Sequence, residues 1–221
     1  FKMHGWTNGD VDEESNMIKA VAKRVGGRMK IMYDAACHLK TLTDALEVGK
    51  VCDDHDLYWY EDPYKDGGVS INGNRVLSEK LSTPILVGEH MRNFETSTDM
   101  LVNGASFFSR ADPDYDGGIT GSLKLAIASE GLGADCEIHS CGPAMRHLIS
   151  ALRNSNFYEV NLLHPNCNNA WSLPIYLDGY SDEINCIDNN GNVTVSDKPG
   201  LGVLYDWDFI KKHTLYKVII D

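Results

Sequence analysis

Short apolar segments alternate with helical patterns along most of this sequence, and this alternation constrains the fold more than any other feature. Each segment is five or six residues long and rich in apolar and aromatic residues, as β-strands are. Strands that alternate with helices predict a parallel sheet whose strands are joined by helical crossovers. The segments are KIMYD (30–34), LYWYE (57–61), PILVGE (84–89), ASFFSR (105–110), DCEIH (135–139) and FYEVN (157–161).

Apolar residues at helical spacing lie between these segments. One stripe runs from Ile18 to Val25, and it follows Asp10 and Glu13, which can form a capping box at the start of a helix. Intervals of three and four residues are typical of one buried helix face. The same spacing recurs in Leu42, Ala45 and Leu46, in Leu123, Ala126 and Ile127, and in Met145, Leu148, Ile149 and Leu152.

An ionisable residue stands at or near the carboxyl end of each segment, and His4 follows a short opening segment. In a (β/α)₈ barrel, the active site lies at the carboxyl ends of the strands. The first and last of these residues lie 155 positions apart, about 26 per interval, and a barrel uses about 31 residues per unit. We therefore predict an α/β fold of the (β/α)₈ type over a doubly wound open sheet. The residues are His4, Asp34, Glu61, Glu89, Asp112, His139 and Glu159.

Seven strands are expected where a closed barrel has eight. We expect residues 1–165 to hold strands two to eight with their helices, and we expect an upstream part of a longer polypeptide to supply the first strand. After about residue 165 the alternation stops. Residues 166–221 are therefore predicted to form a C-terminal extension that packs on the barrel or capping region, with a tight turn at Asn190-Gly191.

The composition favours a folded protein and argues against two classes of partner. The chain has 221 residues, of which 43% are hydrophobic and 24% charged. Its net charge is −12, whereas nucleic acids and anionic membranes are bound by basic patches. Six cysteines in a chain of this length do not suggest a disulfide framework. We expect a cytoplasmic protein with no nucleic-acid or membrane partner.

Three carboxylates on three neighbouring predicted strands suggest a metal site. Asp34, Glu61 and Glu89 would converge on one side of the barrel mouth, and their mutual repulsion would be costly without a cation. Oxygen ligands with no histidine or thiolate among them favour Mg²⁺ over Zn²⁺. The alternative is that each acid is solvated or paired with a basic side chain.

The next two strands end in Asp112 and His139. A carboxylate beside a histidine fixes its tautomer and raises its basicity, as a general base requires. The alternative for His139 is a hydrogen-bonded core histidine. A zinc site of Cys136, His139 and Cys141 has poor geometry, because on a strand Cys136 would point away from the other two.

Three more polar residues are candidates for the site. Lys2 and His4 lie two positions apart on the opening strand and so face the same side. A buried Lys2 near a substrate carboxylate could act as an electrophile or base, and otherwise the two are surface residues. Glu159 could exchange a hydrogen bond with a bound oxyanion, or it could be a solvated strand end.

These residues stand in motifs that resemble the enolase superfamily, in its mandelate racemase and muconate lactonizing enzyme-like branch. The similarity runs from FKMH at the start to PGLGV near the end, and its most specific parts are YEDP, VGEH, DPDYDGGITG and EIHS. The resemblance implies that Asp34, Glu61 and Glu89 bind Mg²⁺, that Asp112 and His139 form a catalytic dyad, and that substrate carboxylate oxygen is held by Glu159.

The resemblance also marks departures from the family pattern. The opening strand of the family usually reads Lys-x-Lys, whereas this chain has Lys2-Met3-His4. His4 therefore stands where the family has its second acid/base, and Ala36 stands where the family often has an asparagine. Family members carry an N-terminal capping domain, and we expect these 221 residues not to include it.

The resemblance implies abstraction of a proton α to a carboxylate, with Mg²⁺ and Lys2 stabilising the enediolate. We predict a Mg²⁺-dependent lyase that dehydrates a sugar acid, with His4 or His139 removing the α-proton and His139 protonating the departing hydroxyl or the product carbon. An epimerase, racemase or cycloisomerase acting on a sugar or anhydro-sugar acid is the alternative within enzymes. A non-catalytic metal-binding relative is the alternative of another class. The branch also leads us to expect a homo-oligomer.

Overall fold

The computed structural model describes residues 1–65, 69–162, 166 and 174–219. The chain divides into two compact units. The first comprises Phe1–His139 with Leu152–Asn156, and the second comprises Ser140–Ala151 with Phe157–Asp221. The boundary predicted between residues 165 and 166 adjoins residues outside the described part, and it stays a prediction.

The first unit is a parallel half-barrel, which confirms the predicted α/β fold class. Each strand pairs in parallel with the next one along the chain, so the order in the sheet equals the order in the sequence. This order is what right-handed βαβ crossovers produce. The strands are β1 (Lys2–His4), β2 (Met32–Asp34), β3 (Tyr60–Glu61), β4 (Ile85–Val87), β5 (Phe108–Ala111) and β6 (Asp135–Ile138).

The predicted strand at 157–161 does not form, and this prediction is wrong. Residues 157–161 belong to the second unit and have no ladder partner among the described residues. Their polar side chains bond to the loop before α6 (Pro143–Ser150) instead. The Tyr158 hydroxyl accepts from the Gly142 N–H at 2.9 Å, and the Glu159 carboxylate accepts from the Ser140 N–H at 2.5 Å. Side-chain bonds thus fix a segment whose composition alone indicates a strand.

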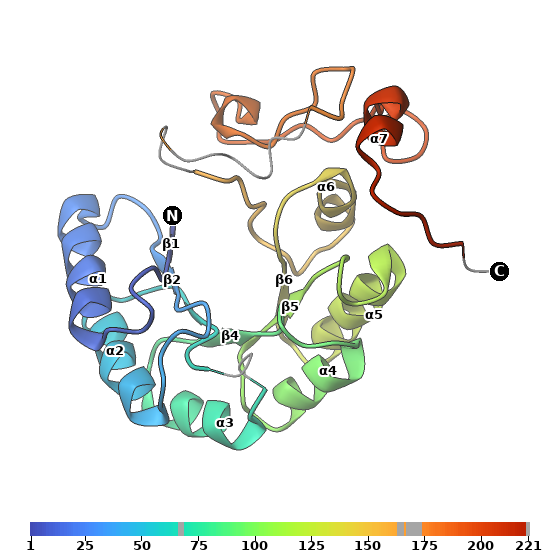
Figure 1. Ribbon diagram of the computed structural model, residues 1–221. Coiled ribbons are helices and arrows are strands. Elements are labelled where there is room, and N and C mark those ends of the chain that lie inside the picture. Colours follow the sequence, from blue (N-terminus) through green and yellow to red (C-terminus); the bar gives the residue numbers. More distant parts are fainter. Residues whose placement is uncertain (66–68, 163–165, 167–173, 220–221) are drawn as a thin grey trace. The chain divides into compact units, whose positions relative to one another are not determined.

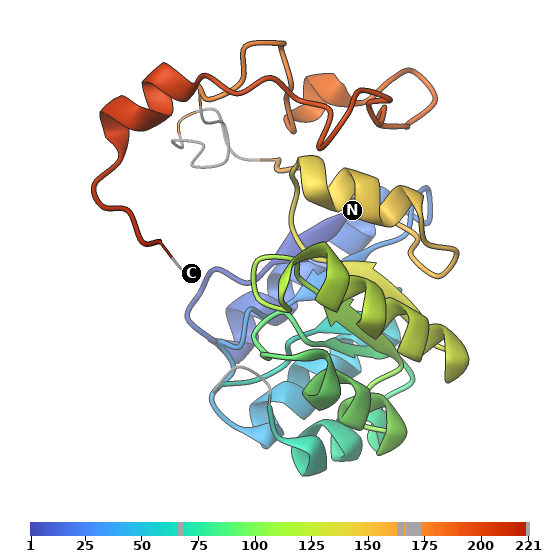
Figure 2. The same cartoon turned by 90° about the vertical axis from the view of Figure 1, so that its right-hand side faces the viewer.

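Helices follow the first five strands in turn, and in Figures 1 and 2 they succeed one another around the sheet in chain order. Three begin at side-chain caps that satisfy otherwise unpaired N–H groups, one of them Ser70, which accepts from the Gly73 N–H at 3.1 Å. Asp10 accepts from the Glu13 N–H at 3.0 Å, and Thr41 and Asp44 form a reciprocal capping box. The helices are α1 (Val11–Val25), α2 (Leu42–Asp54), α3 (Ile71–Lys80), α4 (Phe94–Val102) and α5 (Gly118–Gly131).

The main core of the first unit lies between the sheet and these helices. Ile18 of α1, Leu77 of α3 and Ile85 of β4 are fully buried in this core. The rings of Tyr33 and Tyr60, from adjacent strands, stack with centroids 5.6 Å apart. Burial of these large side chains supplies most of the driving force for the half-barrel.

The helix predicted around Leu123, Ala126 and Ile127 is confirmed as α5, but its buried face differs from the predicted stripe. Ala126 and Leu125 are fully buried, whereas Leu123 and Ile127 are exposed. The start of α5 packs tightly on the preceding loop, since a Cβ on Gly121 would lie 1.5 Å from the Asp116 carbonyl oxygen. The buried residues of α5 are mostly small: Gly121, Ser122, Leu125, Ala126 and Ser129.

The second unit contains α6, a 3₁₀ turn η2 (Ile184–Cys186) and α7 (Trp207–His213). Arg146 of α6 holds this unit together, because its guanidinium pairs with Asp182 at 2.7 Å and donates to the Thr194 carbonyl at 3.2 Å. The turn predicted at Asn190-Gly191 forms, with Gly191 at φ 83° and its N–H bonded to a carbonyl three residues earlier. No helix in the described part of the chain combines the length and the apolarity needed to cross a membrane.

Candidate active site

Strand register brings the three predicted carboxylates together. Asp34 is the register partner of both His4 on β1 and Glu61 on β3. Glu89 follows β4 after Gly88, whose φ of 147° and close approach to the backbone of Arg110 both require a glycine. Oxygens of Asp34, Glu61 and Glu89 all lie within 4.8 Å of one another, and all three residues are buried.

Two cationic side chains contact these acids. The Lys2 ammonium lies 2.9 Å from Glu61 and 3.3 Å from Asp34. The guanidinium Nε of Arg110, itself buried, lies 2.8 Å from Glu61 and 3.8 Å from Glu89. Sequence reasoning missed Arg110, although it precedes Asp112 by two residues and so shares its strand face.

The remaining opening-strand candidate, His4, lies at the edge of this cluster. Its side chain is 65% exposed, and its Nε2 is 4.0 Å from Asp34. Its Nδ1 lies 2.9 Å from the Gly5 carbonyl oxygen, which favours the tautomer that donates to that oxygen. His4 therefore faces solvent beside the acids, unlike Lys2, whose side chain is 20% exposed.

The electrostatics of the acid cluster fit a divalent cation. Burial and then repulsion from Glu61 raise the pKa of Glu89 to about 7. Its Oε2 is buried without a hydrogen bond. Three buried carboxylates are the oxygen donors that Mg²⁺ prefers, and the two neighbouring cations leave part of their charge uncompensated. Asp34, Glu61 and Glu89 can therefore hold Mg²⁺.

The imidazole of His139 lies beside the acid cluster. Its Nδ1 is 2.6 Å from Asp112, which is buried, and its Nε2 is 3.2 Å from Glu89. Asp112 is held by backbone bonds, since its carboxylate accepts from the Asp114 N–H at 2.7 Å. The histidine is thus oriented by one carboxylate while its other nitrogen points toward the three acids.

Two further residues at this end of the sheet were not predicted. Asp62 is fully buried directly after Glu61, and burial followed by repulsion from Glu89 raises its pKa well above the usual value. His90 follows Glu89, and its Nε2 lies 3.3 Å from Glu89 and 3.5 Å from Asp62. Both residues could have been predicted from the sequence. Each comes directly after a predicted strand, and the loops that follow the strands line the mouth of a barrel.

The last predicted site residue, Glu159, belongs to the second unit. Its carboxylate accepts the Ser140 N–H at 2.5 Å, so one of its oxygens has a backbone partner within that unit.

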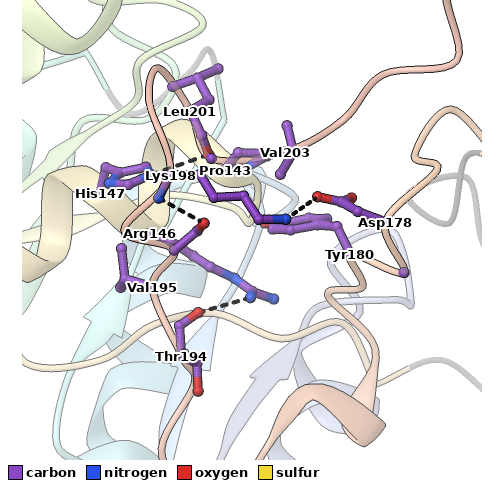
Figure 3. Close-up of a pocket in the computed structure, with 13 residues that line it drawn as sticks. Pro143, Arg146, His147, Asp178, Tyr180, Thr194, Val195, Lys198, Leu201 and Val203 are labelled. Carbon is purple, nitrogen blue, oxygen red and sulfur yellow. Dashed lines mark hydrogen bonds and ion pairs between the residues drawn. The ribbon is translucent and has the colours of Figure 1, made fainter.

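The second unit also has a cavity of its own, of about 270 Å³, which Figure 3 shows. Arg146 and Lys198 are among its lining residues, and both are engaged by acids: Arg146 by Asp182, and Lys198 by Asp178 at 3.5 Å. None of the predicted site residues lines this cavity.

Comparison with known proteins identifies the family. The family described as enolase C-terminal domain-like matches residues 1–209. Among curated proteins, D-xylonate dehydratase of Haloferax volcanii is 26% identical over 211 residues, which cover 93% of this chain and 48% of that protein. L-talarate/galactarate dehydratase of Salmonella typhimurium is 25% identical over 190 residues, covering 86% of this chain and 44% of that protein. The chain thus spans about half the length of these relatives.

A solved structure agrees with the family match. D-glucarate dehydratase from Agrobacterium tumefaciens, complexed with magnesium, superposes with a TM-score of 0.83 at 28% identity. The superposition covers 96% of this chain and 55% of that one. A putative mandelate racemase from Bordetella bronchiseptica superposes with a TM-score of 0.81 at 24% identity. This similarity supports the fold.

Proposed function

The chain belongs to the enolase superfamily and matches the C-terminal domain of its mandelate racemase and muconate lactonizing enzyme branch, and we therefore propose that it takes part in Mg²⁺-dependent dehydration of a sugar acid. The observation that carries the proposal is the imidazole of His139, held at 2.6 Å by Asp112 with its other nitrogen 3.2 Å from Glu89. The dehydratases similar to this chain support the substrate class.

Asp34, Glu61 and Glu89 would hold the metal ion. When bound, Mg²⁺ supplies positive charge beside the substrate carboxylate, where negative charge develops as the α-proton leaves. Lys2 adds a second positive charge in the same region, since its ammonium already contacts two of these acids. A preorganised positive field of this kind stabilises the transition state more than the ground state.

His139 performs the proton transfers in this proposal. Its Nδ1–H donates to Asp112, which leaves Nε2 to exchange a proton with the substrate. A base, His139 or His4, takes the α-proton. The bond from the β-carbon to its hydroxyl then breaks with its electron pair on oxygen, and a proton from His139 releases that oxygen as water. The remaining enol isomerises to a ketone. Glu159 would bind an oxygen of the substrate carboxylate.

Exchange of the substrate α-proton with D₂O tests the proposal on the full-length protein with Mg²⁺ and a panel of sugar acids. We expect His139→Asn and Glu61→Gln to lower the exchange rate by about 10²-fold or more. His55→Asn, at the end of α2, serves as the matched control and should leave the rate unchanged.

Two outcomes contradict the assignment. Exchange that persists in both His139→Asn and Glu61→Gln would remove these residues from the chemistry. A wild-type protein that binds Mg²⁺ but exchanges no sugar acid would be a non-catalytic metal-binding relative. Analysis of products separates dehydration, which forms a keto acid, from epimerisation or ring opening, which conserve the substrate formula.

A further inference from the structure

Three loops at the carboxyl ends of β2, β3 and β4 bring a second set of potential metal ligands together. Cys37 follows β2, Asp62 follows β3 and His90 follows β4. The thiol sulfur, a carboxylate oxygen and an imidazole nitrogen of these residues all lie within 4.8 Å of one another. None of the three is one of the acids proposed to hold Mg²⁺.

The Asp62 carboxylate is the feature that calls for a ligand. The residue is 0% exposed, and neither of its carboxylate oxygens has a hydrogen-bond partner. A buried carboxylate without such a partner is expensive unless a cation compensates its charge. The Lys2 ammonium lies within 3.3 Å of Asp34 and Glu61, and the Arg110 Nε lies within 3.8 Å of Glu61 and Glu89.

The spacing of two of the donor atoms suits a small tetrahedral ion. Asp62 Oδ2 and His90 Nε2 lie 3.5 Å apart. Two ligands that each stand about 2.1 Å from a tetrahedral Zn²⁺ are separated by about 3.4 Å. The Cys37 N–H donates to the Asp62 carbonyl at 3.0 Å, so the backbone already fixes the loops of these two ligands side by side.

The donor types separate this cluster from the three acids. Carboxylates alone select hard cations such as Mg²⁺, whereas a set of thiolate, imidazole and carboxylate selects Zn²⁺. We propose that Cys37, Asp62 and His90 form a second metal site that binds Zn²⁺ or a similarly soft divalent ion. Three protein ligands leave a fourth position for water or another small ligand.

The proposed ion would connect the three loops that follow the strands carrying Asp34, Glu61 and Glu89. His90 Nε2 lies 3.3 Å from Glu89, so the two sites are neighbours. The proposal does not depend on the dehydratase assignment, because it concerns only the binding of a metal by residues outside that chemistry.

Cobalt spectroscopy tests this proposal on the full-length protein. Saturating Mg²⁺ first occupies the hard-ion site, and Co²⁺ is then added as a spectroscopic substitute for Zn²⁺. We expect a thiolate-to-cobalt charge-transfer absorption that saturates at one equivalent of Co²⁺ per chain and is reversed by Zn²⁺. Cys37→Ser should abolish the absorption, and His90→Gln should weaken Co²⁺ binding by about 10-fold or more.

Control variants distinguish the new site from the three-acid site and from other thiols. Glu61→Gln should keep the absorption, and so should Cys186→Ser, which removes a half-buried thiol of the second unit. Wild-type protein without the absorption, or a Cys37→Ser protein that retains it, would overturn the proposal. If Cys37→Ser does not fold, the wild-type protein is tested instead. Mass spectrometry then measures whether Zn²⁺ protects the Cys37 thiol from an alkylating reagent. Unchanged alkylation would then refute the site.

Discussion

The charge of Glu89 should make the metal-free protein less stable as the pH rises. Burial and repulsion raise the pKa of Glu89 from 4.5 to about 7. The folded state therefore binds this proton more tightly than the unfolded state. The stabilisation that comes from this bound proton is complete below pH 4.5 and is lost as the pH rises through 7. The difference between the two pKa values corresponds to about 3 kcal/mol.

Glu89→Gln is the perturbation that isolates this contribution, because a glutamine resembles the protonated acid at every pH. We expect the free energy of unfolding of Glu89→Gln, minus that of the wild type, to rise by about 3 kcal/mol across this pH range. The assay is urea denaturation in chelator at pH values from 4.5 to 8. Glu79→Gln, an exposed residue of α3, is the matched control and should give a flat difference.

The reasoning also predicts the effect of the metal ion. Saturating Mg²⁺ should stabilise the wild type most at high pH, where Glu89 is ionised, and should stabilise Glu89→Gln less. A difference between Glu89→Gln and wild type that stays constant from pH 4.5 to 8 in chelator would refute the claim that this carboxylate is destabilised by burial among like charges.

Two further predictions concern packing and charge in the first unit. Gly121→Ala should destabilise the protein by about 1–3 kcal/mol or more in urea denaturation, because the new Cβ would lie 1.5 Å from a backbone oxygen. Gly131→Ala, also in α5 but with open space around it, should cost less than about 0.5 kcal/mol, and equal losses would contradict the packing argument. Arg110→Met should cost about 3–5 kcal/mol in chelator, since it leaves Glu61 buried with less compensation, and Mg²⁺ should recover part of the loss. Arg153→Met, on the surface, should change stability by less than about 1 kcal/mol. If Mg²⁺ recovers none of the stability lost in Arg110→Met, Arg110 and the three acids do not form a shared charge cluster.

Much of the candidate site could be predicted because its residues follow a local rule. Asp34 and Glu61 end short apolar segments at similar spacing, and parallel strands necessarily bring such ends to one edge. Glu89 follows the same rule after Gly88. The prediction of a strand at residues 157–161 failed because a segment of this composition can also be fixed by side-chain hydrogen bonds. The Tyr158 hydroxyl, for example, bonds to the Gly142 N–H, and the segment has no ladder partner among the described residues.

The contacts that give the site its chemistry could not be predicted in this way. Arg110 pairs with Glu61 across a sheet, although they lie 49 residues apart in the sequence. Whether a charged side chain is buried, and which charge it meets, depends on strand register and on the close packing around it. The face of α5 shows the same limit, since Leu123 fits a buried helical stripe but is exposed.

The amino-acid sequence by itself determined the alternation of strands and helices, because apolar periodicity and helix caps act between near neighbours along the chain. It also determined which strand ends carry acids. Only the tertiary structure decided that the Asp62 carboxylate would be buried without a hydrogen-bond partner and that His90 would lie between two carboxylates. Such pairings arise between loops far apart in sequence, and their energies depend on distances and burial that exist only once the half-barrel has formed.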